Sequence, residues 1–193
     1  MPGDSSLGRP RRGEVDARIH AATLDLVRRS GPRAATIEAV ASHSGVAKTT
    51  IYRRYADREE LLRAALRAAV GAPSLPQVRD VRDKTRAALE QVWTQMDQVL
   101  GRGGLAAILL DDDPTFTGLF RDALAPYDEA LERLIAEDVD AGVLRVDLDA
   151  DAVVTLFVGA YLGRLVRYGR VEEDWLPRAL ELVWVAIAPP ATA

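Results

Sequence analysis

The sequence of 193 residues contains no cysteine, only two histidines and 6% aromatic residues. Without cysteine, the chain has neither a disulfide framework nor a metal site built on thiolates. Its longest mainly apolar stretch, residues 152–163, falls short of the roughly 20 residues that a membrane-spanning helix needs. Residues 1–12 also lack the apolar segment of a secretory signal. We therefore expect a cytoplasmic protein that does not bind or cross a membrane.

Motifs that carry catalysis or hold a cofactor are missing as well. The sequence has no Gly-rich phosphate loop, no nucleophile elbow, and no Ser, His and Asp set that spacing would single out. His20 and His43 lie far apart with no third metal ligand near either of them. The run Asp111-Asp112-Asp113 offers oxygens to a hard cation, but Asp113-Pro114 is better explained as the start of a helix. We predict no catalytic residue, no metal and no cofactor.

The net charge of −4, taken alone, argues against a nucleic-acid partner. The charge is unevenly distributed, however. Residues 1–55 contain ten Lys and Arg against five Asp and Glu, whereas residues 56–193 contain fifteen against twenty-four. A basic first segment on an acidic remainder predicts two separate tasks within one chain.

Apolar residues recur at helical spacing along most of the chain. In the first such segment, Val15, Ile19, Ala22 and Leu26 form a single stripe. Capping residues and helix-breaking glycines and prolines mark the ends of the segments, and Gly101–Gly104 is expected to interrupt one of them. We predict an all-α fold of about nine helices, at residues 14–30, 36–44, 47–55, 57–70, 78–100, 113–123, 126–140, 150–168 and 175–187. The expected capping residues are Thr36, Asp57, Asp113, Asp149 and Asp174.

A stretch rich in Gly, Pro and Ser at Gly71–Pro76 is the best candidate for a domain boundary. It divides the chain into a flexible basic arm at 1–12, a first domain at 13–70 whose fourth helix is the connector, and a larger helical domain at 77–190.

Residues 36–55 combine a short helix, a turn that contains Gly45, and a second short helix rich in polar and basic residues. This is the helix-turn-helix arrangement, whose second helix can enter the major groove of DNA. Val40, Val46 and Ile51 can pack the two helices together. The side chains left projecting offer charge for phosphates and donors for base edges: Lys48, Thr49, Tyr52 and Arg53. Tyr55, at the end of this segment, is expected in the core.

Three strings make the motif far more specific: ATIEAVA at 35–41, SGVAKTTIYRRY at 44–55 and DREELL at 57–62. Together they closely resemble the N-terminal domain of TetR-type transcriptional regulators, over about Glu14–Val70. The remainder resembles the helical regulatory domain of that family in helix count and length. Ala47 departs from the family pattern, in which serine is frequent, so one cap and one phosphate hydrogen bond are missing.

The resemblance implies roles for individual residues. Thr36 and Arg58 match phosphate contacts, and Lys48 and Thr49 match the positions nearest the base edges. Phosphate and mixed contacts are implied for Thr50, Tyr52 and Arg53. Arg9, Arg11 and Arg12 in the basic arm are either solvated or, as in some other helix-turn-helix modules, placed in a minor groove.

The second domain carries apolar stripes that form either an ordinary core or, as the resemblance implies, a cage for a small ligand. The candidates are Trp93, Met96, Leu100, Phe116, Phe120, Tyr127, Phe157 and Tyr161. Small and apolar residues on the last two helices are implied to form a homodimer interface: Leu156, Gly159, Ala160, Gly163, Leu180, Val183, Trp184 and Ile187.

The sequence therefore predicts a homodimeric transcriptional regulator, a repressor that a small-molecule effector releases from a near-palindromic operator in double-stranded DNA. Two alternatives stay open. A helix-turn-helix protein without an effector would serve as a constitutive DNA-binding or protein-docking module. A small all-helical enzyme would use its acidic body to bind a cationic substrate.

Overall fold

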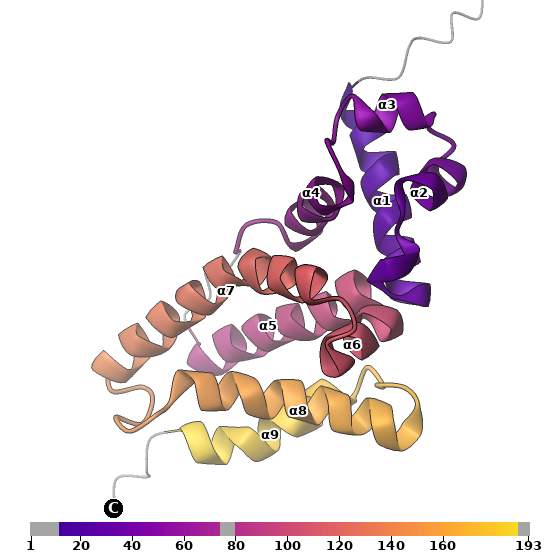
Figure 1. The fold of residues 1–193 in the computed structure, drawn as a ribbon. Helices are drawn as coiled ribbons and strands as arrows, with labels where there is room; N and C mark the ends of the chain where they lie inside the picture. The colour runs from indigo at the N-terminus through magenta and orange to yellow at the C-terminus, as the bar shows by residue number, and fades with distance from the viewer. Residues whose placement is uncertain (1–11, 74–79, 189–193) are drawn as a thin grey trace, which may run out of the picture. The chain divides into compact units, whose positions relative to one another are not determined.

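The computed structural model describes residues 12–73 and 80–188, and within these ranges it consists of helices and contains no strand (Figure 1). The basic arm predicted at 1–12 lies outside the described residues, apart from the backbone of Arg12. The predicted all-α class is confirmed. The α-helices are α1 (Arg12–Ser30), α2 (Ile37–Ser44), α3 (Lys48–Tyr52), α4 (Arg58–Val70), α5 (Val81–Thr94), α6 (Gly101–Leu110), α7 (Pro114–Asp140), α8 (Ala150–Tyr168) and α9 (Trp175–Ile187). A short 3₁₀ helix, Pro32–Ala34, precedes α2, and a π-helical segment, Gln95–Leu100, precedes α6.

The chain forms two compact units, which we call unit 1 and unit 2. Unit 1 comprises Met1–Val70 and Val99–Ala123, and unit 2 comprises Gly71–Gln98 and Leu124–Ala193. Unit 1 thus extends beyond residues 13–70, because α6 and the first part of α7 pack with the N-terminal helices. The functional domains at 13–70 and 77–190 stay a prediction.

The core of unit 1 forms around α1, which contacts α2, α4 and α6. Ile19, Val40, Ile51 and Leu61 come from four different helices and are completely buried together. Burying each of these side chains stabilises the fold by about 1.5–3 kcal/mol relative to leaving it in water. The long α1 therefore fixes the positions of the much shorter α2 and α3.

Side-chain caps start several helices where the sequence predicts them. The Oγ1 atom of Thr36 accepts a hydrogen bond from the amide of Ala39 at 3.1 Å. Carboxylate oxygens accept corresponding amide hydrogen bonds at Asp57, Asp113 and Asp149. Asp174 directly precedes α9 but makes no such bond, and its carboxylate pairs with Arg178 instead. These caps satisfy amides that the first turn of a helix leaves unpaired.

The glycine-rich stretch at 101–104 is helical, which corrects the expected interruption. Only Gly101 has a positive φ, of 54°, and α6 begins there. A Cβ atom on Gly103 would lie 2.5 Å from both the amide nitrogen of Gly31 and the carbonyl oxygen of Val27. Gly103 is therefore glycine because α6 crosses the end of α1 at backbone contact, and not because the chain turns there.

The two helices predicted at 113–123 and 126–140 are one helix, α7, with Pro126 inside it. Proline lacks an amide donor and crowds the preceding turn, which costs about 3 kcal/mol in a helix interior. The helix nevertheless continues, because buried residues on both sides of Pro126, such as Phe120 and Ala130, anchor it by packing.

In unit 2, α5 contacts both α8 and α9. Trp93 donates its indole hydrogen to the carbonyl oxygen of Phe157 at 3.1 Å, and its ring packs edge-on against Tyr161. Lys84 pairs with the buried Asp138 at 2.6 Å, so that α5 is also tied to α7. Among the described residues, no helix is long and apolar enough to cross a membrane.

Candidate nucleic-acid interface

The turn between α2 and α3 is built by two adjacent residues. Gly45 adopts a left-handed conformation with φ of 65°, which side chains other than glycine rarely accept. The Oγ atom of Ser44 accepts a hydrogen bond from the amide of Val46 at 3.2 Å. From α1, Arg18 donates to the carbonyl oxygen of Ser44 at 2.6 Å and so caps the end of α2. These contacts set the direction in which α3 leaves the turn.

One face of α3 is buried and the other is open to solvent. Ile51 is completely buried, whereas the side chain of Tyr52 beside it is 53% exposed. Lys48, Thr49 and Arg53 are exposed, and Thr50 is half-buried. Thr36 is exposed at the start of α2 while its hydroxyl caps that helix. The structure therefore brings six of the seven predicted DNA contacts to the exposed parts of the helix-turn-helix, where each stays a prediction.

Lys48 is not free of other interactions, because its Nζ atom lies 2.8 Å from the Oε1 atom of Glu38 on α2. The hydrogen bond from Lys48, a backbone amide and the positive charge of Lys48 together lower the pKa of Glu38. Both side chains are at least half exposed, so the pair contributes little to stability. Glu38 thereby places a negative charge beside Lys48, which is predicted to lie nearest the base edges.

Ala47 precedes α3 without a side-chain cap, as the sequence predicts. The helix spans only Lys48–Tyr52, and residues that follow it contact α1. Tyr55 is buried, as expected, and its hydroxyl lies 2.9 Å from the Nε2 atom of His20 and 3.3 Å from Asp16. Arg54 also pairs with Asp16, at 3.2 Å. Burial first, and then the charge of Asp16 and its hydrogen bond, raise the pKa of Tyr55 to about 12.

Sequence reasoning missed this network, which we call the α1–α3 clamp: Asp16, His20, Arg54 and Tyr55. A tyrosine in a core position needs a partner for its hydroxyl, and that requirement was the available signal. Burial lowers the pKa of His20, although the charge of Asp16 opposes this effect. The other histidine, His43, pairs with Asp25 at 3.0 Å.

Arg58 occupies a different environment from the other predicted contacts. Its guanidinium donates to the carboxylate of Asp113 at 2.7 Å and to the carbonyl oxygen of Pro32 at 2.6 Å. The remaining aspartates of the 111–113 run also act structurally. Asp111 ends α6 in a left-handed conformation, and Asp112 pairs with Arg33.

The predicted effector residues are divided between the two units. Leu100, Phe116 and Phe120 are buried in unit 1, where the two phenylalanine rings stack 6.5 Å apart. In unit 2, Trp93, Met96, Phe157 and Tyr161 are buried, and the hydroxyl of Tyr127 binds Gln91 and the carbonyl of Ala72. A cavity of about 20 Å³ in unit 2 is lined by residues that include Leu89, Ile135, Asp138 and Val153, and by none of these eight candidates.

The predicted dimer residues fall into three groups by exposure. Leu156, Gly159 and Gly163 are exposed along one face of α8, and no atom outside their own helix lies within 4 Å of a Cβ built on either glycine. Ala160, Val183 and Trp184 are half-buried, and Arg82 of α5 lies over the Trp184 ring. Leu180 and Ile187 are 1% and 3% exposed within their own protomer, so they have almost no surface left for a partner.

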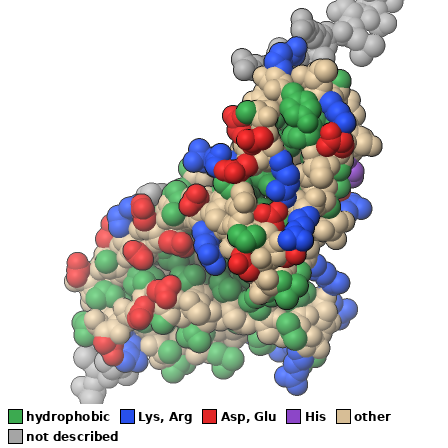
Figure 2. All heavy atoms as spheres, viewed as in Figure 1, with side chains coloured by type: hydrophobic (Ala, Val, Ile, Leu, Met, Phe, Trp, Pro, Cys, Tyr) green, Lys and Arg blue, Asp and Glu red, His purple; other side chains and the backbone are tan. Residues whose placement is uncertain are grey.

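Sequence reasoning did not select the most exposed apolar residues of α8 and α9, which are Val166, Leu182 and Val185. Figure 2 shows hydrophobic side chains on the surface of the region that α8 and α9 form in Figure 1. These three residues lie on the solvent-exposed faces of α8 and α9, which the helical period also places.

Residues 19–65 match the family described as bacterial regulatory proteins, tetR family. No curated protein is significantly similar to the chain in sequence. A transcriptional regulator TetR family protein from Vibrio parahaemolyticus is similar in structure, with a TM-score of 0.62, 25% identity, and coverage of 90% of this chain and 98% of that one.

Two further solved structures share the fold at lower sequence identity. The transcriptional regulator FadR from Bacillus subtilis, in complex with stearoyl-CoA, has a TM-score of 0.67 and 16% identity over 86% of this chain and 96% of that one. A transcriptional regulator from Saccharomonospora viridis, in complex with choline, has a TM-score of 0.68 and 21% identity over 92% and 99%.

Proposed function

The chain belongs to the tetR family of bacterial regulatory proteins, and from this premise we propose that it is a transcriptional repressor released from its operator by a small molecule. The observation that carries the proposal is the exposed polar face of α3, whose opposite face is anchored by the buried Ile51. A helix fixed in this way can enter a major groove without rearranging the domain. Because the operator lies on bacterial DNA, we place the protein in the cytoplasm.

The six predicted contacts of the helix-turn-helix divide into two kinds. Lys48 and Thr49, at the start of α3, face base edges, while Thr36, Thr50, Tyr52 and Arg53 hold phosphates. We assign DNA binding to residues 13–70, with α4 as the connector, and effector binding and dimerisation to 77–190.

We propose that the second copy of the chain binds to α8 and α9. The exposed Leu156, Val166, Leu182 and Val185 on these helices form an apolar surface that a partner would cover. The outward glycines Gly159 and Gly163 let a partner helix approach closely. A twofold dimer presents two copies of α3, so the operator is a near-palindrome with half-sites about one helical turn apart.

We propose that the effector binds in unit 2 beside Trp93, Met96, Tyr127, Phe157 and Tyr161. Support comes from two proteins of the same fold, which bind stearoyl-CoA and choline. These two ligands differ in chemistry, so they serve as first probes. A ligand releases the protein from DNA only to the extent that it binds the released conformation more tightly than the DNA-bound one.

The DNA contacts are tested on a site selected from random duplex DNA. We expect Lys48→Ala to relax base preference, and Tyr52→Ala to weaken binding to all sequences. Arg53→Ala should lower the slope of log affinity against log salt by about one. The matched control is Arg121→Ala, since Arg121 is an exposed arginine of unit 1 on α7. Affinity, base preference and salt slope left unchanged by all three interface substitutions would contradict the proposal.

A further inference from the structure

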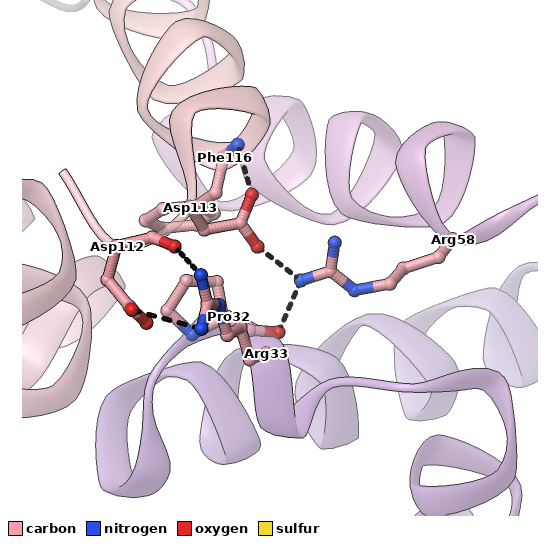
Figure 3. A network of polar contacts seen from close by, with 6 residues as sticks. All are labelled: Pro32, Arg33, Arg58, Asp112, Asp113 and Phe116. Carbon is pink, nitrogen blue, oxygen red and sulfur yellow. Dashed lines mark hydrogen bonds and ion pairs between the residues drawn. The ribbon is translucent and has the colours of Figure 1, made fainter.

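A single carboxylate holds the beginnings of two helices together in unit 1. The Oδ2 atom of Asp113 accepts the hydrogen bond from Arg58, the first residue of α4, while its Oδ1 atom accepts from the amide of Phe116 and so caps α7 (Figure 3). The same Arg58 nitrogen donates to the carbonyl of Pro32, which follows α1. Arg58 therefore joins three segments that are distant in sequence.

The ion pair between Arg58 and Asp113 is less exposed to solvent than the nearby pair between Arg33 and Asp112. The side chains of Arg58 and Asp113 are 30% and 10% exposed, whereas those of Arg33 and Asp112 in the same corner are 70% and 45% exposed. Partial removal from water strengthens a charge-assisted hydrogen bond and raises the cost of leaving one partner alone. The Arg58–Asp113 pair thus fixes geometry in a way that the Arg33–Asp112 pair does not.

The pairing also changes what Arg58 can contribute at the DNA. An arginine strengthens DNA binding by neutralising a phosphate and releasing its counterion, and each such contact steepens the salt dependence of binding. The charge of Arg58 is already balanced by Asp113 within the protein. A phosphate would have to compete with a carboxylate that is 2.7 Å away and largely buried.

We propose that Arg58 is a positioning residue rather than a phosphate ligand: bound to Asp113 and Pro32, it holds the start of α4 against the corner between α6 and α7. Asp113 is then a determinant of operator affinity although its carboxylate faces Arg58. The inference rests on the proposed function, since it concerns the affinity for DNA.

The test measures operator affinity at several salt concentrations for the full-length wild type, Asp113→Asn and Arg58→Lys. Asparagine caps a helix as well as aspartate does, so the Phe116 amide keeps its acceptor while the negative charge is lost. Lysine keeps the positive charge but cannot reproduce the guanidinium geometry. We expect both variants to bind about two- to thirtyfold more weakly than the wild type, with an unchanged salt slope.

The matched control is Asp112→Asn, the same substitution one residue away in the more exposed pair, which should leave the affinity unchanged. A phosphate-binding Arg58 predicts the opposite pattern: Asp113→Asn would release the guanidinium and strengthen binding, and Arg58→Lys would keep the affinity. Either of those results overturns the proposal. The unfolding midpoint of each variant is measured alongside, and Arg58→Lys decides the question if Asp113→Asn does not fold. A wild-type chain that binds no duplex DNA would overturn the proposed function itself, and this proposal with it.

Discussion

Gly103 of unit 1 serves the opposite purpose to Gly159 and Gly163 of unit 2, although all three are helical. In unit 1, Gly103 lies where α6 crosses α1, and a Cβ there would overlap backbone atoms of Gly31 and Val27. In unit 2, a Cβ on Gly159 or Gly163 of α8 would meet no atom within 4 Å outside that helix. The residue type is the same, but one unit uses it for an internal contact and the other leaves it on the surface. Changes to these glycines should therefore affect stability in unit 1 and association in unit 2.

The largest effect is expected at Gly103. In Gly103→Ala, the added methyl group meets rigid backbone on both sides, so α6 must move away from α1. We expect the free energy of unfolding to fall by about 3 kcal/mol, at the upper end for overpacked cores. Chemical denaturation measures it. Gly118→Ala is the control, because a Cβ at this helical glycine meets nothing within 4 Å. The control should be neutral or stabilised by up to about 1 kcal/mol, and an equal loss in both variants would contradict the comparison.

Gly163 should respond in the opposite way. Gly163→Leu places a large side chain on the open face of α8, so the protomer keeps its stability while a closely approaching partner helix is displaced. We expect dimerisation to weaken about thirtyfold, equivalent to about 2 kcal/mol. Analytical ultracentrifugation across a concentration series measures the dissociation constant of the dimer. Gly118→Leu makes the same change on α7 and should leave dimerisation unaltered. A Gly163→Leu chain that dimerises as tightly as the wild type would show that α8 does not form the interface.

The α1–α3 clamp is a second internal contact of unit 1. Tyr55→Phe removes the hydroxyl that meets His20 and Asp16, and should cost about 1 kcal/mol of unfolding free energy, which chemical denaturation measures.

The same contact predicts a dependence of stability on pH. Because burial lowers the pKa of His20 in the folded state, the unfolded chain takes up the proton first as pH falls. Stability should therefore be complete above the unfolded pKa of about 6.5 and decrease as pH falls below it. Denaturation at pH 7.5 and at pH 5.5 measures the loss, which His20→Gln should abolish.

The smallest effect is expected from the exposed pair of Glu38 and Lys48. In Glu38→Gln, a negative charge beside α3 disappears and the ammonium of Lys48 becomes available to DNA. Exposed pairs of this kind contribute up to about 1 kcal/mol, so we expect affinity to rise about two- to threefold. Binding titrations at low and moderate salt measure it. Glu59→Gln, which removes another exposed glutamate from an ion pair on α4, is the matched control. Weaker binding by Glu38→Gln would mean that Glu38 itself contacts a base.

The sequence predicted features that depend on a few neighbouring residues. Thr36, Asp57, Asp113 and Asp149 were found because a cap is made within three residues of the side chain. The exposed face of α3 was found because burial follows the helical period. Most of the fold and the exposed face of α3 were thus predictable.

Features that depend on residues distant in the chain were not predictable. A glycine-rich stretch resembles a helix break unless Val27 and Gly31 are known to lie against Gly103. The ion pair of Arg58 is not apparent from the local sequence, because its partner Asp113 lies 55 residues later. The burial of individual α9 residues was not predictable either, since an apolar helix with one face in the core and another exposed has two apolar stripes. The predicted interface set therefore includes the buried Leu180 and omits the exposed Leu182.

The shortness of α3 has a consequence for how this helix unfolds. A helix of five residues is too short to be stable on its own, and Ala47 adds no cap. Its order comes from Ile51 and from the α1–α3 clamp, both of which belong to the core of unit 1. The amide hydrogens of α3 should therefore exchange with solvent only when that core opens, and at the same rate as those of the buried part of α1.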